Sequence, residues 1–278
     1  MILGNALRQG AELLENDRIP APQLTAEVLL AHALGRDRAY LYAHPEQQLS
    51  EAQQVHYGRY LHERLRGEPT QYITGRQEFY GRLFQVSPAV FIPRPETELV
   101  VEAALRFPGR ARRVLDIGTG SGCLAITLQK EWPQASVFAC DISSEALAVA
   151  RRNAQRLQAE VGWFCADTAE ACQEASFDLV VSNPPYVPQT EAAGLPREVR
   201  DHEPAIALFP GPLGIEFYPK LLAGAARVLR PAGWLIVELG YKSRPAVEPL
   251  VGEEWSNCVV EQDLAGFDRV MVLRKKQS

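Results

Sequence analysis

The N-terminal part of the chain has apolar residues at helical spacing. Leucines recur over residues 3–14, and a second apolar run over 24–35 ends in a glycine, the residue type that commonly follows a helix C-terminus. A third run opens with Ser50, a favoured N-cap residue, and closes at Gly67. The pattern predicts a small helical domain over residues 1–75.

The pattern changes between residues 68 and 92. This stretch is rich in aromatic and β-branched residues and is interrupted by glycines at 75 and 81, which favours a β-hairpin. We expect a hairpin linker over residues 76–92 that joins the helical region to a larger domain over 93–278.

Strand-like and helix-like segments alternate from residue 110 onward. The expected strands are 112–118, 135–141, 159–167, 177–183 and 233–240, and the expected helices are 122–132, 143–157 and 217–230. Near-continuous apolar strands that alternate with helices predict an α/β fold with a parallel sheet covered on both faces. Residues 257–276 read as two strands joined by a short turn, which predicts an antiparallel hairpin at the sheet edge.

The composition is that of an ordinary globular protein. The chain has 278 residues, of which 46% are hydrophobic and 23% charged, and its formal net charge is -5. No apolar run approaches the ~18 residues that span a bilayer. The N-terminus lacks the basic-then-apolar layout of a secretory signal. The expected compartment is therefore cytoplasmic.

The cysteines and histidines give no sign of a disulfide frame or a metal site. The five cysteines are odd in number, form no Cys-x-x-Cys pair and include several in apolar stretches. We expect them to act as small hydrophobic residues in a reducing compartment. The five histidines are scattered along the chain, so no metal is expected.

A glycine-rich loop follows the first strand of the larger domain. Gly118, Gly120 and Gly122 alternate between this strand and a helix, where glycines let the backbone approach a ligand closely. A dinucleotide fingerprint needs its third glycine at position 123, which is cysteine. Asp116 would oppose a pyrophosphate but suits a ligand with an ammonium or sulfonium group. A strand–helix turn without a ligand is the alternative, although three alternating glycines cost backbone entropy.

The next two strands also end in acidic residues. Asp141 lies 19 residues after Gly122, about the spacing at which an acid accepts hydrogen bonds from the ribose hydroxyls of an adenosine. Asp141 could instead cap the helix that starts near Ser143. Asp167 or Thr168 would border an adenine ring. With the glycine loop, these residues predict a pocket for an adenosine with a charged amino-acid tail, which is S-adenosyl-L-methionine.

The fourth strand ends in Asn183, Pro184, Pro185 and Tyr186. A rigid turn is the simplest interpretation, because Asn-Pro and Pro-Pro form turns. The position at a strand's carboxyl end favours a binding role. The Asn183 side-chain oxygen and the Pro184 carbonyl are two acceptors for the hydrogens of a planar NH2 group, and Tyr186 would stack on the substrate. The nitrogen lone pair would then point at a methyl carbon.

These motifs resemble those of class I methyltransferases that act on planar amino groups. Three segments, in this order along the chain, resemble a narrower family, the release-factor glutamine methyltransferases (PrmC or HemK). They are Pro-Arg-Pro-Glu-Thr-Glu at 93–98, Asn-Pro-Pro-Tyr at 183–186 and residues 197–208. The resemblance covers nearly the whole chain. It implies a Rossmann-like seven-stranded methyltransferase sheet with an antiparallel C-terminal hairpin, and a small helical substrate-recognition domain joined by a β-hairpin.

The family methylates the side-chain amide N5 of the glutamine in the Gly-Gly-Gln motif of bacterial class I peptide chain release factors. The cofactor is S-adenosyl-L-methionine, and the product is S-adenosyl-L-homocysteine. The resemblance implies that the cofactor would contact Gly118, Thr119, Gly120, Ser121, Gly122, Asp141, Thr168 and Asn183. The target amide would be held by Asn183, Pro184, Pro185 and Tyr186, of which Asn183, Pro184 and Tyr186 would be catalytic.

An N6-adenine DNA or RNA methyltransferase is the nearest alternative, because it would use the same pocket on a flipped base. Charge argues against it: residues 1–90 carry 9 basic and 10 acidic residues and the remainder 20 and 24, so neither part is the basic clamp that phosphate binding requires. A non-catalytic binding module is disfavoured by the intact Asn-Pro-Pro-Tyr. A nicotinamide dehydrogenase is disfavoured by Asp116 and Cys123.

Overall fold

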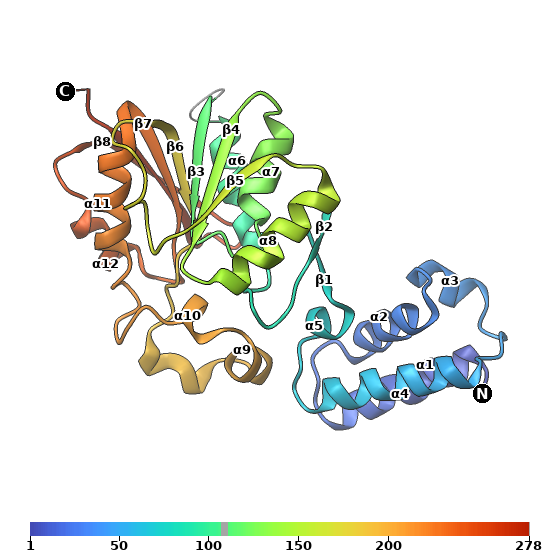
Figure 1. The fold of residues 1–278 in the computed structure, drawn as a ribbon. Helices are drawn as coiled ribbons and strands as arrows, with labels where there is room; N and C mark the ends of the chain where they lie inside the picture. Colours follow the sequence, from blue (N-terminus) through green and yellow to red (C-terminus); the bar gives the residue numbers. More distant parts are fainter. Residues whose placement is uncertain (107–110, 278) are drawn as a thin grey trace. The chain divides into compact units, whose positions relative to one another are not determined.

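The computed structural model describes residues 1–106 and 111–277 (Figure 1). The chain divides into two compact units. The first comprises Met1–Arg76 together with Pro196–His202, and the second comprises Gln77–Leu195 with Glu203–Ser278. The sequence pattern does not predict that Pro196–His202 belongs with the N-terminal helices, because this segment follows the fourth strand of the larger domain.

The first unit is helical, as the spacing of its apolar residues predicts. Leucines of the first four helices form its core. Ser50 caps the fourth helix as expected, in a capping box with Gln53, and the second helix ends at Gly35 in the left-handed conformation. The helices are α1 (Leu3–Asn16), α2 (Pro22–Leu34), α3 (Arg38–Ala43), α4 (Glu51–Leu65), α5 (Thr70–Thr74) and the short α9 (Arg197–His202).

The expected hairpin consists of β1 (Arg76–Phe79) and β2 (Arg82–Gln85). Its turn residues Tyr80 and Gly81 both have positive φ, which matches the twist of the flanking strands. Gln85 gives and receives a backbone hydrogen bond with the side chain of the buried Asn153 in α8 (Ser144–Leu157). The hairpin is thereby fastened to the second unit, and residues 86–92 continue without strand structure.

Seven strands form the sheet of the second unit, in the order β5-β4-β3-β6-β7-β9-β8 (Figure 1). Strands β3 to β7 pair in parallel, whereas β9 runs antiparallel to both β7 and β8. The predicted parallel sheet and the antiparallel edge hairpin are both confirmed. The strands are β3 (Arg113–Ile117), β4 (Ser136–Asp141), β5 (Val161–Cys165), β6 (Phe177–Ser182), β7 (Leu229–Glu238), β8 (Trp255–Gln262) and β9 (Asp268–Lys275).

Helices cover both faces of this sheet, as the apolar character of its strands predicts. One core contains α6 (Glu98–Arg106), α7 (Cys123–Glu131), part of α8 and the hairpin. The other contains α11 (Tyr218–Val228) and α12 (Arg244–Val247). Adjacent residues of β3 belong to different cores, because successive side chains of a strand point to opposite faces. The shorter elements are η1 (Pro95–Thr97), η2 (Gln189–Gly194), α10 (Ala205–Leu208) and η3 (Glu248–Leu250).

Over the described ranges 1–106 and 111–277, no helix has the length and apolar character needed to cross a membrane. The five cysteines are free thiols, and Cys123 and Cys140 are buried. Within the same ranges, no three His, Cys, Asp or Glu side chains are grouped closely enough to hold a metal ion.

Candidate active site

The carboxyl ends of the central strands bring the predicted motifs together. Ile117, at the end of β3, pairs with Cys140 of β4 on one side and with Ser182 of β6 on the other. The next residues along the chain, Gly118, Asp141 and Asn183, therefore lie at one edge of the sheet. After β3, the strands β4 and β5 are added on one side of it, and β6 is then added on its other side. The carboxyl ends of β3, β4 and β6 therefore form a topological switch point, where open α/β sheets bind ligands.

The three glycines of the loop serve two different purposes. All three have positive φ, which disfavours other residue types. Gly118 is exposed, and a Cβ at this position would lie 4.0 Å from the Asn183 carbonyl oxygen. Gly122 is buried, and its Cβ would lie 2.9 Å from Ile126 and 3.1 Å from Ala150. The lack of a side chain at Gly118 thus leaves the surface at the carboxyl end of β3 accessible, whereas Gly122 permits close packing of α7 and α8.

Asp116 supports the glycine loop through hydrogen bonds made inside the protein. Its side chain is completely buried, and its Oδ2 accepts hydrogen bonds from the Thr119 hydroxyl at 2.6 Å and from the Ala125 N–H at 3.2 Å. Burial raises the pKa of this carboxyl group to about 7. Asp116 has no exposed surface, so it supports the loop from inside the protein, and its compatibility with a cationic ligand stays a prediction.

Asp141 connects the glycine loop to the turn before α8, but it is not the N-cap of that helix. Its Oδ2 accepts from the Gly120 N–H and its Oδ1 from the Ser143 N–H, both at 2.9 Å. The N-cap of α8 is Ser143, whose Oγ accepts from the Ala146 N–H. Burial raises the pKa of Asp141. Asp141 therefore ties the glycine loop to the start of α8, with its carboxylate at the switch point.

Thr168 lies just past the end of β5 and is 2% exposed. Its N–H donates to the Glu170 carboxylate at 3.0 Å, and its carbonyl oxygen accepts from the Cys140 thiol at 3.4 Å. The neighbouring Asp167 forms an ion pair with Lys220 of α11. The backbone around residues 167 and 168 is thereby fixed beside the end of β4.

Asn183 is oriented by a residue from another part of the chain. Its Nδ2 donates to the Thr97 hydroxyl at 3.0 Å, which leaves Oδ1 as the acceptor of the side-chain amide. Thr97 is buried and ends the turn η1. The preceding residue, Ser182, donates from its hydroxyl to the Ile117 carbonyl at 2.7 Å, which joins the ends of β6 and β3.

Tyr186 is directed into the protein by its hydroxyl group. The phenol donates to Glu238 Oε1 at 3.0 Å, and burial raises its pKa well above the ordinary value. One edge of the ring packs on Gly240, where a Cβ would lie 2.8 Å from Tyr186 Cδ2. Pro184, between Asn183 and Tyr186, is buried. The Asn-Pro-Pro-Tyr turn is thus held at both ends.

Sequence reasoning assigned no role at this site to Glu238 or Thr97. Glu238 is the last residue of β7, is 1% exposed, and has a pKa that burial raises to about 7. The hydrogen bond from Tyr186 and the charge of Arg269 partly offset this shift. The sequence signal that could have identified Glu238 is an acidic residue directly after the apolar run at the end of a predicted strand.

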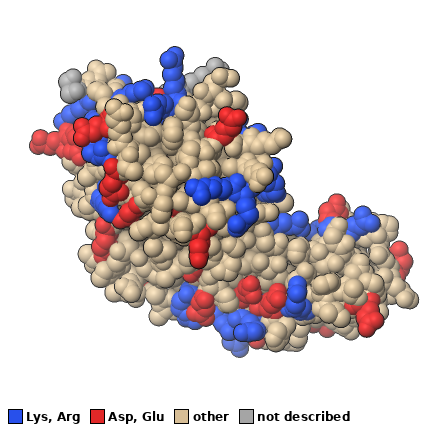
Figure 2. All heavy atoms as spheres, in the orientation of Figure 1, with Lys and Arg blue, Asp and Glu red and all other residues tan. Residues whose placement is uncertain are grey.

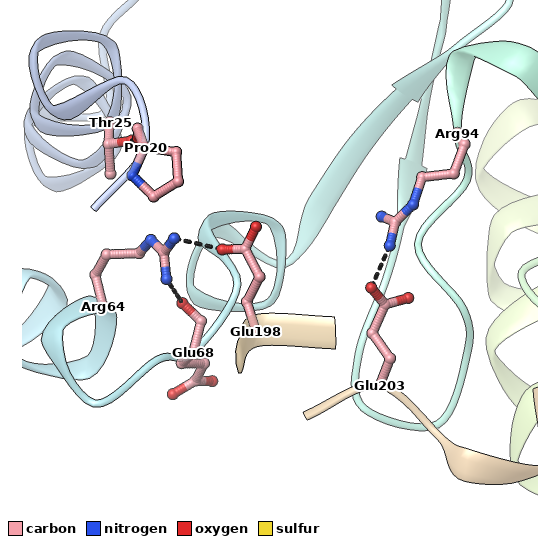
Figure 3. A network of polar contacts seen from close by, with 7 residues as sticks. All are labelled: Pro20, Thr25, Arg64, Glu68, Arg94, Glu198 and Glu203. Carbon is pink, nitrogen blue, oxygen red and sulfur yellow. Dashed lines mark hydrogen bonds and ion pairs between the residues drawn. The ribbon is translucent and has the colours of Figure 1, made fainter. Parts of the chain in front are cut away.

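The segment from Pro93 to Glu98 connects to the distant segment 197–208 through Arg94. Arg94 forms an ion pair with Glu203 (Figure 3). The same carboxylate accepts from the Ile92 N–H at 3.1 Å. Arg94 also stacks over the Phe91 ring at 4.6 Å. These contacts fix the turn that precedes Thr97.

The residues just before Glu203 are held within the first unit. Arg64 of α4 is 4% exposed, forms an ion pair with Glu198 of α9, and donates to the Glu68 carbonyl at 3.2 Å (Figure 3). A Cβ at Gly67 would lie 2.9 Å from the Arg197 side chain. The absence of a side chain at Gly67 therefore leaves room for α9.

The surface carries both signs of charge. Figure 2 shows basic and acidic side chains interspersed on the face that it draws. Ion pairs along the chain include Arg82 with Glu131 and Arg230 with Asp178. This distribution agrees with the near balance of charges that the sequence gives for each part of the chain.

Two family models match the chain in the order of its parts. The model of the PrmC N-terminal domain matches residues 5–75, and that of the methyltransferase small domain matches residues 95–195. The second match spans the glycine loop, Asp141 and the Asn-Pro-Pro-Tyr turn.

Solved structures share the fold. The hMettl16 catalytic domain, solved in complex with MAT2A 3'UTR hairpin 1, has a TM-score of 0.57 and 17% identity, with 84% of each chain covered. The 16S rRNA N2 G1207 methyltransferase of Thermus thermophilus, solved with AdoMet and guanosine, has a TM-score of 0.53 and 22% identity, covering 72% of this chain and 50% of that one. At such identities the likeness concerns the class I methyltransferase fold alone.

Curated relatives match over the whole length. The release factor glutamine methyltransferase of Koribacter versatilis is 46% identical over 281 residues, and that of Moorella thermoacetica is 40% identical over 284 residues. Each comparison covers 100% of both chains. The chain therefore belongs to the release factor glutamine methyltransferase family.

Proposed function

We propose that this protein methylates N5 of the glutamine side chain in the Gly-Gly-Gln motif of class I peptide chain release factors, with S-adenosyl-L-methionine as the methyl donor. The observation that carries the proposal is the orientation of Asn183 beside the exposed Gly118, with Nδ2 engaged by Thr97 and Oδ1 left to accept. Full-length relatives named for this activity support the substrate. Release factors act in the cytoplasm, which is the compartment the proposal implies.

The residues at the switch point fit the cofactor. Gly118 to Gly122, including Thr119 and Ser121, would form the wall beside the methionine part, where Gly118 leaves surface open. The Asp141 carboxylate would accept hydrogen bonds from the ribose hydroxyls, because each of its oxygens has a lone pair beyond the one used by a backbone N–H. Thr168 and its neighbours would border the adenine.

The target amide would bind in the Asn-Pro-Pro-Tyr turn. Asn183 Oδ1 and the Pro184 carbonyl would each accept one hydrogen of the glutamine NH2 group. Pro185 stiffens the turn because its φ is fixed. The ring of Tyr186 would stack on the planar amide, while its hydroxyl group remains hydrogen-bonded to Glu238.

The chemistry is an in-line displacement. S-adenosyl-L-methionine, when bound, would supply a methyl group to the amide nitrogen, and the electron pair of the broken C–S bond would pass to sulfur. Asn183 and Pro184 hold the amide nitrogen so that its lone pair points at the methyl carbon, and they stabilise the positive charge that develops on it. The methylated nitrogen then loses one proton to water. Positioning and electrostatics therefore supply the rate enhancement.

Labelled cofactor tests the proposal against an adenine methyltransferase. The protein is incubated with a release factor, with its Gly-Gly-Gln→Gly-Gly-Ala variant, and with duplex DNA. Label on the wild-type factor alone is the expected result. Label on DNA would establish the alternative, and absence of label from all three would exclude both activities.

Asn183→Ala tests the site itself. Loss of one preorganised polar contact lowers kcat by ~10²–10³-fold in other enzymes, and we expect a similar loss here with cofactor binding retained. Glu253→Gln, in the exposed turn before β8, is the control. Near-normal methylation by Asn183→Ala would remove Asn183 from the mechanism.

A further inference from the structure

Glu203 is a buried carboxylate that holds a distant segment of the second unit. It is 6% exposed, whereas Ala205 and Ile206 shortly after it are exposed. Its Oε1 accepts from the Arg94 guanidinium (Figure 3), and its Oε2 accepts from the Ile92 N–H at 3.1 Å. A buried carboxylate is costly unless it is paired and hydrogen-bonded. Because both oxygens of Glu203 are used in this way, the carboxylate fixes where residues 92–94 lie.

The segment that Glu203 holds leads directly into the turn η1. Arg94 is the N-cap of η1, and its carbonyl oxygen accepts from the Thr97 N–H at 3.1 Å. A three-residue turn is not stable by itself, because its few hydrogen bonds do not offset the cost of fixing the backbone. The end of η1 continues into α6, and its start is fixed by the contacts of Ile92 and Arg94 with Glu203.

Thr97 connects the position of η1 to the site of methyl transfer. Its side chain is buried, and its hydroxyl oxygen accepts from Asn183 Nδ2 at 3.0 Å. A hydrogen bond weakens steeply when its length and angle depart from the preferred values. Displacement of Thr97 would therefore release the Asn183 amide, which could then turn its NH2 group toward the NH2 group of the target. Each step from Glu203 to Asn183 is a hydrogen bond or an ion pair.

We propose that Glu203 is a positioning residue for methyl transfer: by holding Ile92 and Arg94, it places the Thr97 hydroxyl where that group fixes the orientation of the Asn183 amide. The inference rests on the proposed function for the identity of the target amide. The orientation of Asn183 itself is a property of this chain and is measurable without any substrate.

Glu203→Gln tests the proposal with the smallest change of shape. Glutamine has one oxygen that accepts and one NH2 group that only donates, so it cannot accept from both Ile92 and Arg94. We expect kcat to fall by ~10–100-fold, because misplacement of a group by about 1 Å can cost about 10²-fold in rate. The Kd of the cofactor is expected to stay unchanged, as for Asn183→Ala. Equal kcat values for the wild type and Glu203→Gln would overturn the proposal.

Asp178 provides a matched control, because its carboxylate is held in the same way. It accepts from the backbone N–H groups of Arg112 at 2.9 Å and Arg113 at 2.8 Å, and from the Arg230 guanidinium at 2.6 Å. It stands near the start of β6, whereas Asn183 follows the end of that strand. Asp178→Asn is expected to lower the resistance to urea without lowering kcat. Equal losses of kcat in Asp178→Asn and Glu203→Gln would indicate general destabilisation and would overturn the proposal.

A double-mutant cycle with Thr97 tests the route of the effect. Thr97→Val keeps the shape of the side chain and removes its hydroxyl group. If Glu203 acts through Thr97, adding Glu203→Gln to Thr97→Val changes kcat by no more than about twofold, whereas independent effects would multiply and refute the route. Thr97→Ser keeps the hydroxyl group and is expected to keep the response to Glu203→Gln. Where Glu203→Gln does not fold, Arg94→Met takes its place, because it removes the guanidinium but keeps an unbranched side chain over the Phe91 ring.

A readout without catalysis separates this inference from the proposed function. The side-chain amide resonances of Asn183 are assigned by their disappearance in Asn183→Ala. In Glu203→Gln and in Thr97→Val they are expected to shift toward the positions of exposed amides, whereas in Asp178→Asn they are expected to stay in place. If the wild type methylates no release factor, the proposed function fails while these shifts still support the positioning role. Unchanged resonances in Glu203→Gln would refute that role even in an active enzyme.

Discussion

Asp116→Asn would reveal how a buried carboxyl group makes the stability of the second unit depend on pH. Asparagine keeps the shape of the side chain and an oxygen that can accept from Thr119 and Ala125, as Asp116 Oδ2 does. It removes only the ability to ionise. The amide nitrogen of the asparagine takes the place of Asp116 Oδ1, which is buried without a hydrogen-bond partner.

The expected effect follows from the raised pKa of Asp116, which burial moves from 3.8 to about 7. Between these values the unfolded chain has lost the proton that the folded protein keeps, so wild-type stability falls as pH rises. The slope is about 1.4 kcal/mol per pH unit. From pH 5 to pH 8, the stability of Asp116→Asn relative to the wild type should therefore rise by roughly 3 kcal/mol. A buried amide N–H without a partner subtracts ~1–3 kcal/mol at every pH.

Tryptophan fluorescence measures the right transition. The chain contains four tryptophans, at positions 132, 163, 234 and 255, and all of them lie in the second unit. Urea unfolding followed at pH 5, 6, 7 and 8 gives the free energy of unfolding for wild type and variant. Glu238 also titrates in this range, but it is present in both proteins and cancels in the difference.

A stability difference that stays constant from pH 5 to pH 8 would refute the reasoning. It would mean that Asp116 has the same charge in the folded and unfolded states, which contradicts the effect of its burial. Glu253→Gln, at an exposed position, is expected to leave the curve of the wild type unchanged.

Two further substitutions test the loop. Asp141→Ala removes a charged acceptor and is expected to weaken cofactor binding by ~10–100-fold in calorimetry, the equivalent of one hydrogen bond to a charged group; an unchanged Kd would exclude its ribose role. Gly122→Ala is expected to destabilise the second unit by ~1–3 kcal/mol through its positive φ, and by more through contacts of the new Cβ with Ile126 and Ala150. Gly120→Ala, which has a positive φ but nothing within 4 Å of its Cβ, is the matched comparison in urea unfolding, and equal losses would contradict the packing argument.

The fold was predictable because its main signals are local. Strands such as β3, in which Val114 and Leu115 are both fully buried, read as apolar runs without alternation. The cap at Ser50 and the glycines of the hairpin mark where elements start and turn. The assignment of Pro196–His202 to the first unit was not predictable, because the segment contacts helices that are distant in sequence, as in the ion pair of Arg64 with Glu198.

The site was predictable only where it follows the chain continuously. Asn183 and Gly118 lie in short motifs directly after strands, and the sheet topology brings these motifs together. Thr97 lies 86 residues from Asn183, and Glu238 lies 52 residues from Tyr186, so no local pattern connects them. The burial of Asp116 was not predictable for a related reason: the sequence gives its charge and its position after a strand but not what surrounds it.

The interleaving of the two units has a consequence for how such proteins can be recombined. The chain passes between the units three times, once at Arg76 and twice around Pro196–His202. A chimera that exchanges only residues 1–76 between relatives would combine Arg64 with a foreign partner segment. A mismatch there leaves a buried guanidinium without its carboxylate, at a cost of ~3–5 kcal/mol. The part that can be exchanged between relatives is therefore discontinuous in sequence. The helical unit and the heptapeptide 196–202 must be exchanged together, and we expect them to evolve together.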